Sequence, residues 1–386
     1  MNTKIYLDNA ATTQIDKRVF EAMVPYLSEV YGNASSLHQY GTIVKEQIEN
    51  SRKRIATYLK CEPEELVFTS SGTEANNFAI KGIAFANRSK GNHIIVSSVE
   101  YDCVLNTCKW LETQGFFVTY VPVDNKGLID IDFLKRCINQ KTILVSVMHV
   151  NNEIGTIQPI AEIGNICKEK NVYFHSDACQ SFGKIPVDTH HIDLLTVNSH
   201  KIYGPKGVGA LMIKKGTKIN PLFHGGGQEF GLRSSTENIE GITGFAKATD
   251  LCFGEMENEF KRISGLQKKL ISSLSHDIEG IYFNGDLDKR LPHNINFCIR
   301  GLEGEAIRFL LLLDEAGIAV SSGSACSSNG DNQASHVLQA IGLNQFEARG
   351  SIRISIGRYN TDEELARFSE VFKNKITNLN SIFSKS

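Results

Sequence analysis

The chain has 386 residues, with 41 Lys or Arg against 43 Asp or Glu, a formal charge of −2. This balance argues against a dedicated nucleic-acid binder, because such proteins usually carry a basic excess. No apolar run approaches the ~20 residues that cross a bilayer, and the N-terminus lacks the regions of a signal peptide. The nine cysteines include no CxxC pair, which indicates reduced thiols without a metal site. We therefore expect a cytoplasmic protein that binds neither membrane nor nucleic acid directly.

The first part of the chain carries alternating strand and helix patterns. From about residue 64 to 215, short β-branched apolar runs alternate with amphipathic stretches. The expected strands are Leu66–Thr69, His93–Ser97, Phe117–Val121, Thr142–His149, Val172–Ser176, Leu194–Asn198 and Gly209–Ile213. The expected helices are Glu74–Ala86, Tyr101–Gln114, Ile131–Ile138 and Ile160–Lys168. Such alternation predicts an α/β domain around a mostly parallel, buried sheet.

The pattern changes near Leu251. Apolar residues at helical spacing between Met256 and Leu274 predict one long amphipathic helix. The elements expected after it are strands at Asn294–Ile299, Ile318–Ser321 and Ser351–Ser355, and helices at Gly304–Ala316 and Asp362–Ile376. This mixture predicts a second, smaller α+β domain.

Two motifs follow expected strands. The first, TSSGTE at 69–74, opens a helix with small residues. The positive end of that helix suits a bound anion, although an ordinary N-cap explains the motif as well. The second is Asp177, which ends an apolar strand at the edge where α/β proteins bind ligands. Its carboxylate can pair with a cationic ring nitrogen of a cofactor, or it can cap a helix.

A turn rich in Gly and Pro, SHKIYGPKG at 199–207, joins two expected strands. A lysine held in such a turn can be partly desolvated, with a lowered pKa, and can form a Schiff base. Lys201 and Lys206 both qualify by spacing, and an exposed loop lysine is the plainer alternative.

Two residues near the C-terminus also suggest chemistry. Cys326 stands in SSGSACSSNG at 321–330, among small polar residues that would not bury it. A thiol in such a setting suits a group-transfer nucleophile, with an incidental cysteine as the alternative. Arg353 lies inside an expected strand, where a guanidinium is costly unless it is paired. It either binds a ligand's carboxylate or forms an internal salt bridge.

Taken together, these motifs resemble those of the pyridoxal-phosphate-dependent cysteine desulfurases of the IscS/NifS type, which are class V aminotransferase-like enzymes. The resemblance covers nearly the whole chain. The segments that carry it are YLDNAATT (6–13), TSSGTEANN (69–77), MHVNNEIG (148–155), SDACQS (176–181), SHKIYGPKG (199–207), HGGG (224–227), RSSTEN (233–238), SSGSACSS (321–328) and SIR (351–353).

The resemblance implies a particular architecture. It is an α/β fold, the fold-type I of pyridoxal-phosphate-dependent transferases. A large domain at 15–250 holds a mainly parallel seven-stranded sheet and binds the cofactor. A small α+β domain at 1–14 and 251–386 carries the cysteine loop. Two copies form a homodimer with active sites at the interface.

The resemblance also implies roles for single residues. Lys201 carries the pyridoxal 5'-phosphate covalently, Asp177 pairs with its ring nitrogen, and Arg353 holds the substrate carboxylate. Asn152 and Gln180 contact the ring oxygen or the substrate. The residues implied around the phosphate are Gly72, Thr73, Asn198, Ser199 and His200, with Thr236 from the other subunit.

The activity implied is the conversion of L-cysteine to L-alanine. Lys201 moves the Cα proton, and the Cys326 thiolate attacks the substrate sulfur, keeps it as a persulfide and passes it to a protein acceptor. The sulfur could serve iron–sulfur cluster assembly, tRNA thiolation or DNA sulfur modification.

Three positions depart from the family pattern. Tyr101 replaces a histidine that stacks on the cofactor and moves protons. A tyrosine can still stack, but its ordinary pKa of about 10 makes it a poorer base. We keep Tyr101 and His200 with Lys201 and Cys326 as candidate catalytic residues. Asn198 replaces a common Ser, and Ser235 a Gly.

Two other functions stay open at this point. The first is a selenocysteine lyase or a class V aminotransferase-like enzyme without sulfur relay, which the cysteine segment argues against. The second is an inactive scaffold of a sulfur-transfer complex, which the three departures suggest and the retained Lys201, Asp177, Cys326 and Arg353 argue against.

Overall fold

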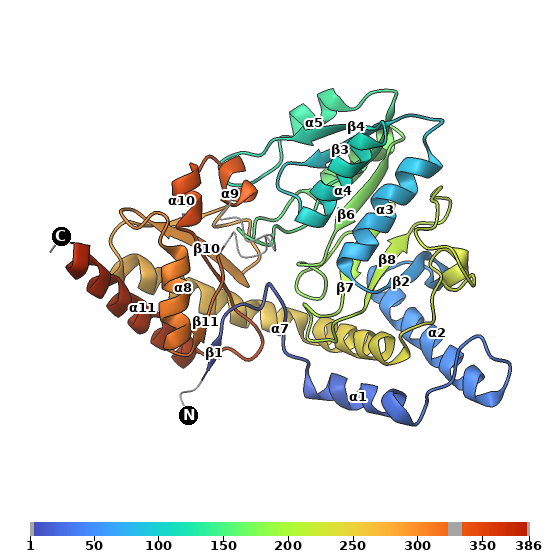
Figure 1. The fold of residues 1–386 in the computed structure, drawn as a ribbon, viewed down its shortest axis with the longest axis horizontal. Coiled ribbons are helices and arrows are strands. Elements are labelled where there is room, and N and C mark those ends of the chain that lie inside the picture. The colour runs from blue at the N-terminus through green and yellow to red at the C-terminus, as the bar shows by residue number, and fades with distance from the viewer. Residues whose placement is uncertain (1–3, 323–333, 384–386) are drawn as a thin grey trace.

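The computed structural model describes residues 4–322 and 334–383, with side chains up to residue 377. Two parts lie side by side and share one long helix, α7 (Ile239–Asp277). The larger part holds the α/β sheet, and the smaller part holds both chain ends (Figure 1).

The larger part is built on one seven-stranded sheet. Its strands, in spatial order, are β2 (Leu66–Thr69), β8 (Gly209–Ile213), β7 (Leu194–Asn198), β6 (Tyr173–Asp177), β5 (Thr142–Ser146), β3 (His93–Ser97) and β4 (Phe117–Val121). Strand β8 runs antiparallel to both its neighbours, and the other pairs are parallel. The predicted α/β fold with a mainly parallel seven-stranded sheet is confirmed.

Helices cover both faces of this sheet, so its central strands are buried along almost their whole length. One face packs against α3 (Gly72–Ala86) and α4 (Asp102–Thr113). The helices that contribute to the core on the other face are α1 (Lys17–Ser28), α2 (Gln39–Leu59), α5 (Ile131–Cys137), α6 (Ile160–Glu169) and the first half of α7.

The smaller part has its own core. Strands β9 (Ile281–Asn284), β10 (Asn294–Ile299) and β12 (Ile352–Ser355) form an antiparallel sheet, and β1 (Ile5–Tyr6) pairs in parallel with β11 (Ile318–Ala319). Its helices are α8 (Ala306–Glu315), α9 (His336–Ala340), α10 (Gln345–Arg349) and α11 (Asp362–Phe383). The N-terminal strand is thus built into the C-terminal part of the chain.

Helix α7 belongs to both cores. Ile242 and Phe245 belong to the core that packs against the large sheet, whereas Ile263 and Leu270 belong to the core of the smaller part. The boundary predicted near residue 250 falls inside this continuous helix, and the division into two domains stays a prediction.

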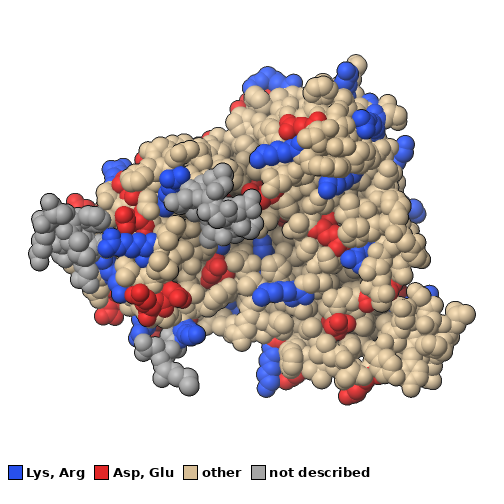
Figure 2. Space-filling view, viewed as in Figure 1, with Lys and Arg blue, Asp and Glu red and all other residues tan. Residues whose placement is uncertain are grey.

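Within residues 4–322 and 334–383, no helix combines the length and the apolarity that are needed to cross a bilayer. On the face drawn in Figure 2, basic and acidic side chains are interspersed rather than gathered into a patch of one sign.

Candidate active site

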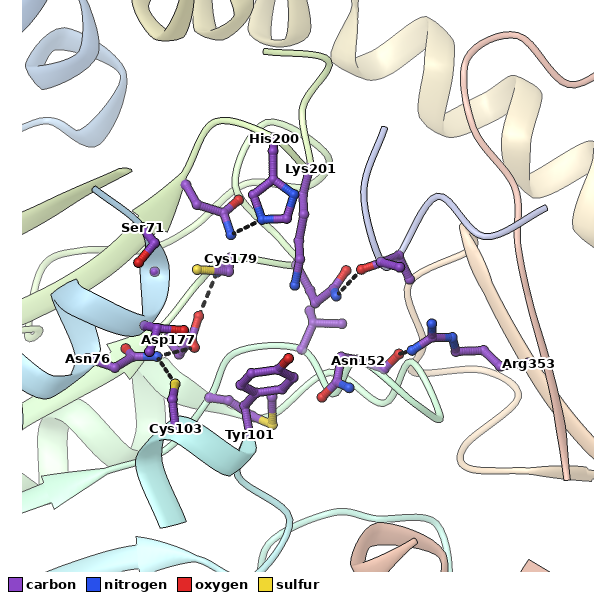
Figure 3. A pocket seen from close by; sticks show the side chains of 18 residues that line it. Ser71, Asn76, Tyr101, Cys103, Asn152, Asp177, Cys179, His200, Lys201 and Arg353 are labelled. Atoms are coloured by element: carbon purple, nitrogen blue, oxygen red, sulfur yellow. Dashed lines mark hydrogen bonds between the residues drawn. The ribbon is translucent and has the colours of Figure 1, made fainter. Parts of the chain in front are cut away.

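A cavity of about 180 Å³ lies where the parallel strands of the large sheet end and the smaller part begins. Polar residues far apart in the sequence line it (Figure 3). The predicted site residues that it brings together are Gly72, Thr73, Tyr101, Asn152, Asp177, Gln180, Asn198, His200, Lys201 and Arg353. A crevice at the carboxyl ends of strands is the usual ligand site of an open α/β sheet.

Lys201 reaches this cavity from the turn after β7. Its side chain lines the wall, and its Nζ lies 5.7 Å from the centre of the Tyr101 ring. In Figure 3 it extends between Asp177 on one side and Arg353 on the other. Lys206 is exposed and lies outside the cavity lining. The geometry therefore favours Lys201 over its competitor.

The N-terminal segment holds the turn that carries Lys201. The hydroxyl and backbone N–H of Thr13 both donate to the His200 carbonyl at 2.9 Å, and the Thr13 hydroxyl accepts from the Tyr203 N–H at 2.8 Å. Tyr203 has a left-handed φ of 65°, which a non-glycine residue rarely adopts. These contacts fix the backbone on both sides of Lys201.

Asp177 ends β6 with its carboxylate locked in place. One oxygen accepts from the backbone N–H of Cys179 at 2.8 Å, and the other accepts from the Asn76 amide at 2.6 Å. Asn76 Nδ2 also lies 3.2 Å from the Cys103 sulfur. Two donors aimed at the two oxygens fix the orientation of the carboxylate. Asp177 can therefore hold a cationic partner in one orientation.

The start of α3 forms the polar end of the cavity. Ser71 caps the helix by accepting from the Glu74 N–H at 3.1 Å, and Gly72 follows as the first helical residue. A Cβ at Gly72 would lie 2.6 Å from the Cys179 sulfur, so a larger residue would displace the Cys179 side chain that lines the cavity. The free N–H groups and helix dipole at this end favour a bound anion.

His200 stands beside this polar end as a neutral ring. Burial, together with the positive charge of Lys201, lowers the pKa of His200 to about 4. Its Nδ1 lies 3.2 Å from the Thr12 hydroxyl, and its Nε2 lies 3.4 Å from the Asn198 amide nitrogen. The ring can therefore donate or accept a hydrogen bond at neutral pH without carrying charge.

Arg353 closes the cavity on the side of the smaller part. Its guanidinium donates to Asp8 Oδ1 at 2.8 Å and to the Asn152 carbonyl at 3.2 Å. The internal salt bridge is thus present, yet the buried Arg353 Nε has no hydrogen-bond partner in the structure. Its two ion-pair and carbonyl contacts use only two of the five N–H donors of the guanidinium.

Three predicted site residues do not line the cavity. Ser199 is buried behind it, next to Gly204. Thr236 lines a different hollow with Ser70 and Gly207. Cys326 lies outside the described residues.

The structure also adds residues that the sequence did not single out. Asn76 and Cys103 line the cavity, Thr12 contacts His200, and Asp8 pairs with Arg353. The signal for Thr12 and Asp8 was the YLDNAATT segment, to which no role could be given without knowing where it folds. Nothing in the sequence pointed to Asn76 individually.

The residues present fit a phosphorylated, ring-shaped cofactor with an aldehyde. A lysine amine, a locked carboxylate and a helix N-terminus face one cavity. Within the described part of the chain, two buried polar atoms of residues that line it lack a hydrogen-bond partner: Asn76 Oδ1 and Asn198 Oδ1. Because such atoms are costly to leave unpaired, a bound polar group is expected to satisfy them.

Comparison with known proteins agrees with this geometry. The model of the aminotransferase class-V family matches residues 5–368. A cysteine desulfurase IscS of Dictyoglomus turgidum is 49% identical over 99% of this chain and 97% of that protein. A solved NifS-like protein superposes with a TM-score of 0.91 at 37% identity, covering 97% of this chain and 100% of that one. A structure described as SspA in complex with cysteine has a TM-score of 0.82 at 38% identity, covering 93% and 100%.

The fold and the cavity define a class V aminotransferase-like protein, and the chain matches that family over most of its length. Within it, the chain belongs to the IscS/NifS type of cysteine desulfurases, as the sequence motifs predicted. Enzymes of this family depend on pyridoxal phosphate.

Proposed function

We propose that this protein converts L-cysteine to L-alanine and transfers the sulfur through Cys326 to an acceptor. The observation that carries the proposal is the convergence of Lys201, Asp177 and Arg353 on one cavity. These groups come from three distant parts of the sequence, and together they match the demands of an amino-acid substrate bound to a cofactor ring.

Pyridoxal 5'-phosphate is the cofactor we propose for this cavity. When bound, it withdraws electrons from the Cα of the substrate. Lys201 would hold it covalently, Asp177 would face its ring nitrogen and Tyr101 would stack on the ring. The phosphate would lie at the start of α3 among Gly72, Thr73, Asn198 and His200, which line the cavity.

The chain's own groups then bind the substrate and move its proton. Arg353 binds the carboxylate at the edge of the cavity, and Asn152 and Gln180 border the same space. Lys201, released from the cofactor, takes the proton from Cα and returns it later. His200 supports the phosphate as a neutral hydrogen-bond partner, because its pKa is lowered to about 4.

The sulfur leaves by displacement at the substrate's Sγ. The Cys326 thiolate forms the new S–S bond, the C–S bond breaks, and its electron pair remains with the carbon fragment, which protonates to L-alanine. The related protein SspA was solved in complex with cysteine, which supports L-cysteine as the substrate here. A protein acceptor then takes the terminal sulfur, for iron–sulfur cluster assembly, tRNA thiolation or DNA sulfur modification.

Incubating the purified holoenzyme with L-cysteine tests the proposal. We expect L-alanine to form, and peptide mass mapping to find one additional sulfur atom on the peptide that contains Cys326. L-serine is a suitable control, because it has the same carboxylate and amine but no sulfur. Sulfur release with pyruvate and no alanine would indicate elimination instead and would contradict the proposal.

We also propose that the active unit is a homodimer. Large apolar side chains are exposed along α1, α2 and the turn between them, including Phe20, Leu27, Tyr31 and Tyr40. Thr236 lies away from the chain's own cavity, so in this proposal it reaches the phosphate of the second copy. Light scattering is expected to give twice the 42.8 kDa of one chain. A Leu27→Glu variant is expected to shift the mass toward the monomer, and a wild-type monomer that is fully active would contradict the proposal.

The cytoplasm is the compartment we propose. The eight cysteines in the described residues are all free, as expected where thiols stay reduced.

A further inference from the structure

The ion pair between Asp8 and Arg353 lies at the edge of the cavity. Arg353 is the largest side chain that is almost completely buried, and it lies on β12 at the edge of the cavity. Asp8 comes from the N-terminal segment, 345 residues earlier, and accepts from the Arg353 guanidinium at 2.8 Å. In the proposed function the positive charge of Arg353 binds the substrate's carboxylate. That charge is therefore already paired with a carboxylate of the chain itself.

The Asp8 carboxylate is held in place by its backbone. A parallel bridge joins Asp8 to Ser355, beside the strand that carries Arg353. The Asp8 carbonyl also accepts from the Tyr6 hydroxyl at 3.0 Å and from the Ala11 N–H at 3.1 Å. None of these contacts uses the Asp8 side chain, so the carboxylate can be changed without removing them.

The charges around Asp8 match those that an incoming carboxylate would meet. Burial raises the pKa of Asp8, whereas the positive charges of Arg353 and Lys201 oppose that rise. The same two cations line the cavity. A ligand's carboxylate bound to Arg353 in the cavity would share the guanidinium with Asp8, and two like charges so close together repel each other.

We propose that Asp8 is a specificity-determining residue, a resident counter-ion of Arg353 that weakens the binding of carboxylates in the cavity. The inference rests on the proposed function, because it takes Arg353 as the anchor of the substrate carboxylate. Small organic acids without an amine then bind weakly, and a substrate must gain affinity through its amine as well. Selectivity of this kind arises from a repulsive element as much as from attractive contacts.

The test compares carboxylate binding by calorimetry in the holoenzyme and in Asp8→Asn. Propionate is the probe, and propionamide is its neutral counterpart. The amide oxygen of the variant can still accept from Arg353, so the guanidinium keeps a partner while the negative charge is removed. We expect the dissociation constant for propionate to fall by roughly tenfold or more, with no change for propionamide. A propionate affinity that is unchanged or weaker in the variant overturns the inference.

Asp16→Asn is the matched control. Asp16 is another buried N-terminal aspartate, and it pairs with the C-terminal Arg358 at 2.6 Å, but it does not line the cavity. We expect Asp16→Asn to leave propionate affinity unchanged. A tightening equal to that of Asp8→Asn would show a general effect of lost negative charge and would overturn the inference.

Two further variants distinguish a failure of the proposed function from a failure of the inference about Asp8. If Arg353→Gln binds propionate as well as the wild type, the carboxylate anchor in the proposed function is wrong. If Arg353→Gln loses binding while Asp8→Asn matches the wild type, only the inference about Asp8 fails. Asp8→Ser removes the same charge with a smaller side chain and is expected to tighten propionate binding as well, so it provides the readout if Asp8→Asn does not fold.

Discussion

Replacing Lys201 with alanine is expected to reduce alanine formation by about a thousandfold or more, because one amine both holds the cofactor and moves the Cα proton. Within the described residues, Lys201 is the one lysine that lines the cavity. After borohydride reduction, we expect the wild type to retain a covalent cofactor adduct on Lys201 and the variant to have none. The measurements are L-alanine production and peptide mass mapping.

Two other lysines make this experiment informative. Lys206→Ala is the matched control from the same turn, and since Lys206 is exposed, we expect the adduct and the activity to persist. Lys184 is buried, and burial lowers its pKa to about 7, which makes its amine the strongest rival. A reducible adduct on Lys184 in either the wild type or Lys201→Ala would contradict the assignment.

Replacing Cys326 with serine is expected to abolish the persulfide, while the protein still binds cofactor and cysteine. A hydroxyl cannot replace the thiolate, so we expect sulfur transfer to fall by at least about a hundredfold. Cysteine binding can be followed through the change in cofactor absorbance, and persulfide formation through peptide mass. Unchanged sulfide release in the presence of thiol would refute Cys326 as the nucleophile.

The structure identifies the thiols that could compete with Cys326. Cys103 and Cys179 line the cavity, but burial raises the pKa of Cys103 to about 12 and that of Cys179 well above its ordinary value. Such thiols stay protonated at neutral pH and react poorly. We therefore expect no persulfide on either, and Cys61→Ser, outside the cavity, serves as the activity control.

The sequence predicted the strands of the large sheet better than the helices that cover it. Five of its seven expected strands, among them His93–Ser97 and Leu194–Asn198, have the observed bounds, because strands buried on both faces form short apolar runs with clear ends. No helix was expected over α1 or α2. Phe20, Leu27 and Tyr40 are exposed there, which blurs the apolar stripe that normally marks a helix.

The start of helix α7 was also not predicted from the sequence. The amphipathic pattern marked only its second half, whereas the helix begins at Ile239. Its first turns contain Gly241 and Gly244, which disfavour a helix in isolation. Both glycines are buried in the folded protein. Tertiary packing therefore decides where the helix begins.

The candidate site was predictable where a motif resembled a known one, and not where it depended on long-range contacts. Lys201, Asp177 and Arg353 were named from the sequence. The contact of Arg353 with Asp8 joins residues 345 positions apart, and no local pattern encodes it. The same holds for Thr13 and His200, which are joined across 187 positions.

The pairing of the chain's two ends has a consequence for biosynthesis. β1 pairs with β11, and Asp8 and Asn9 contact Ser355, so during synthesis this N-terminal segment must wait for partners up to 346 residues further along the chain. At about 5–20 residues per second, the wait lasts roughly 20 to 70 seconds. The turn that carries Lys201 gains its Thr13 contacts only when that segment docks. A chain that stalls before β12 lacks Arg353 and the strand beside which Asp8 docks, and therefore cannot complete the cavity.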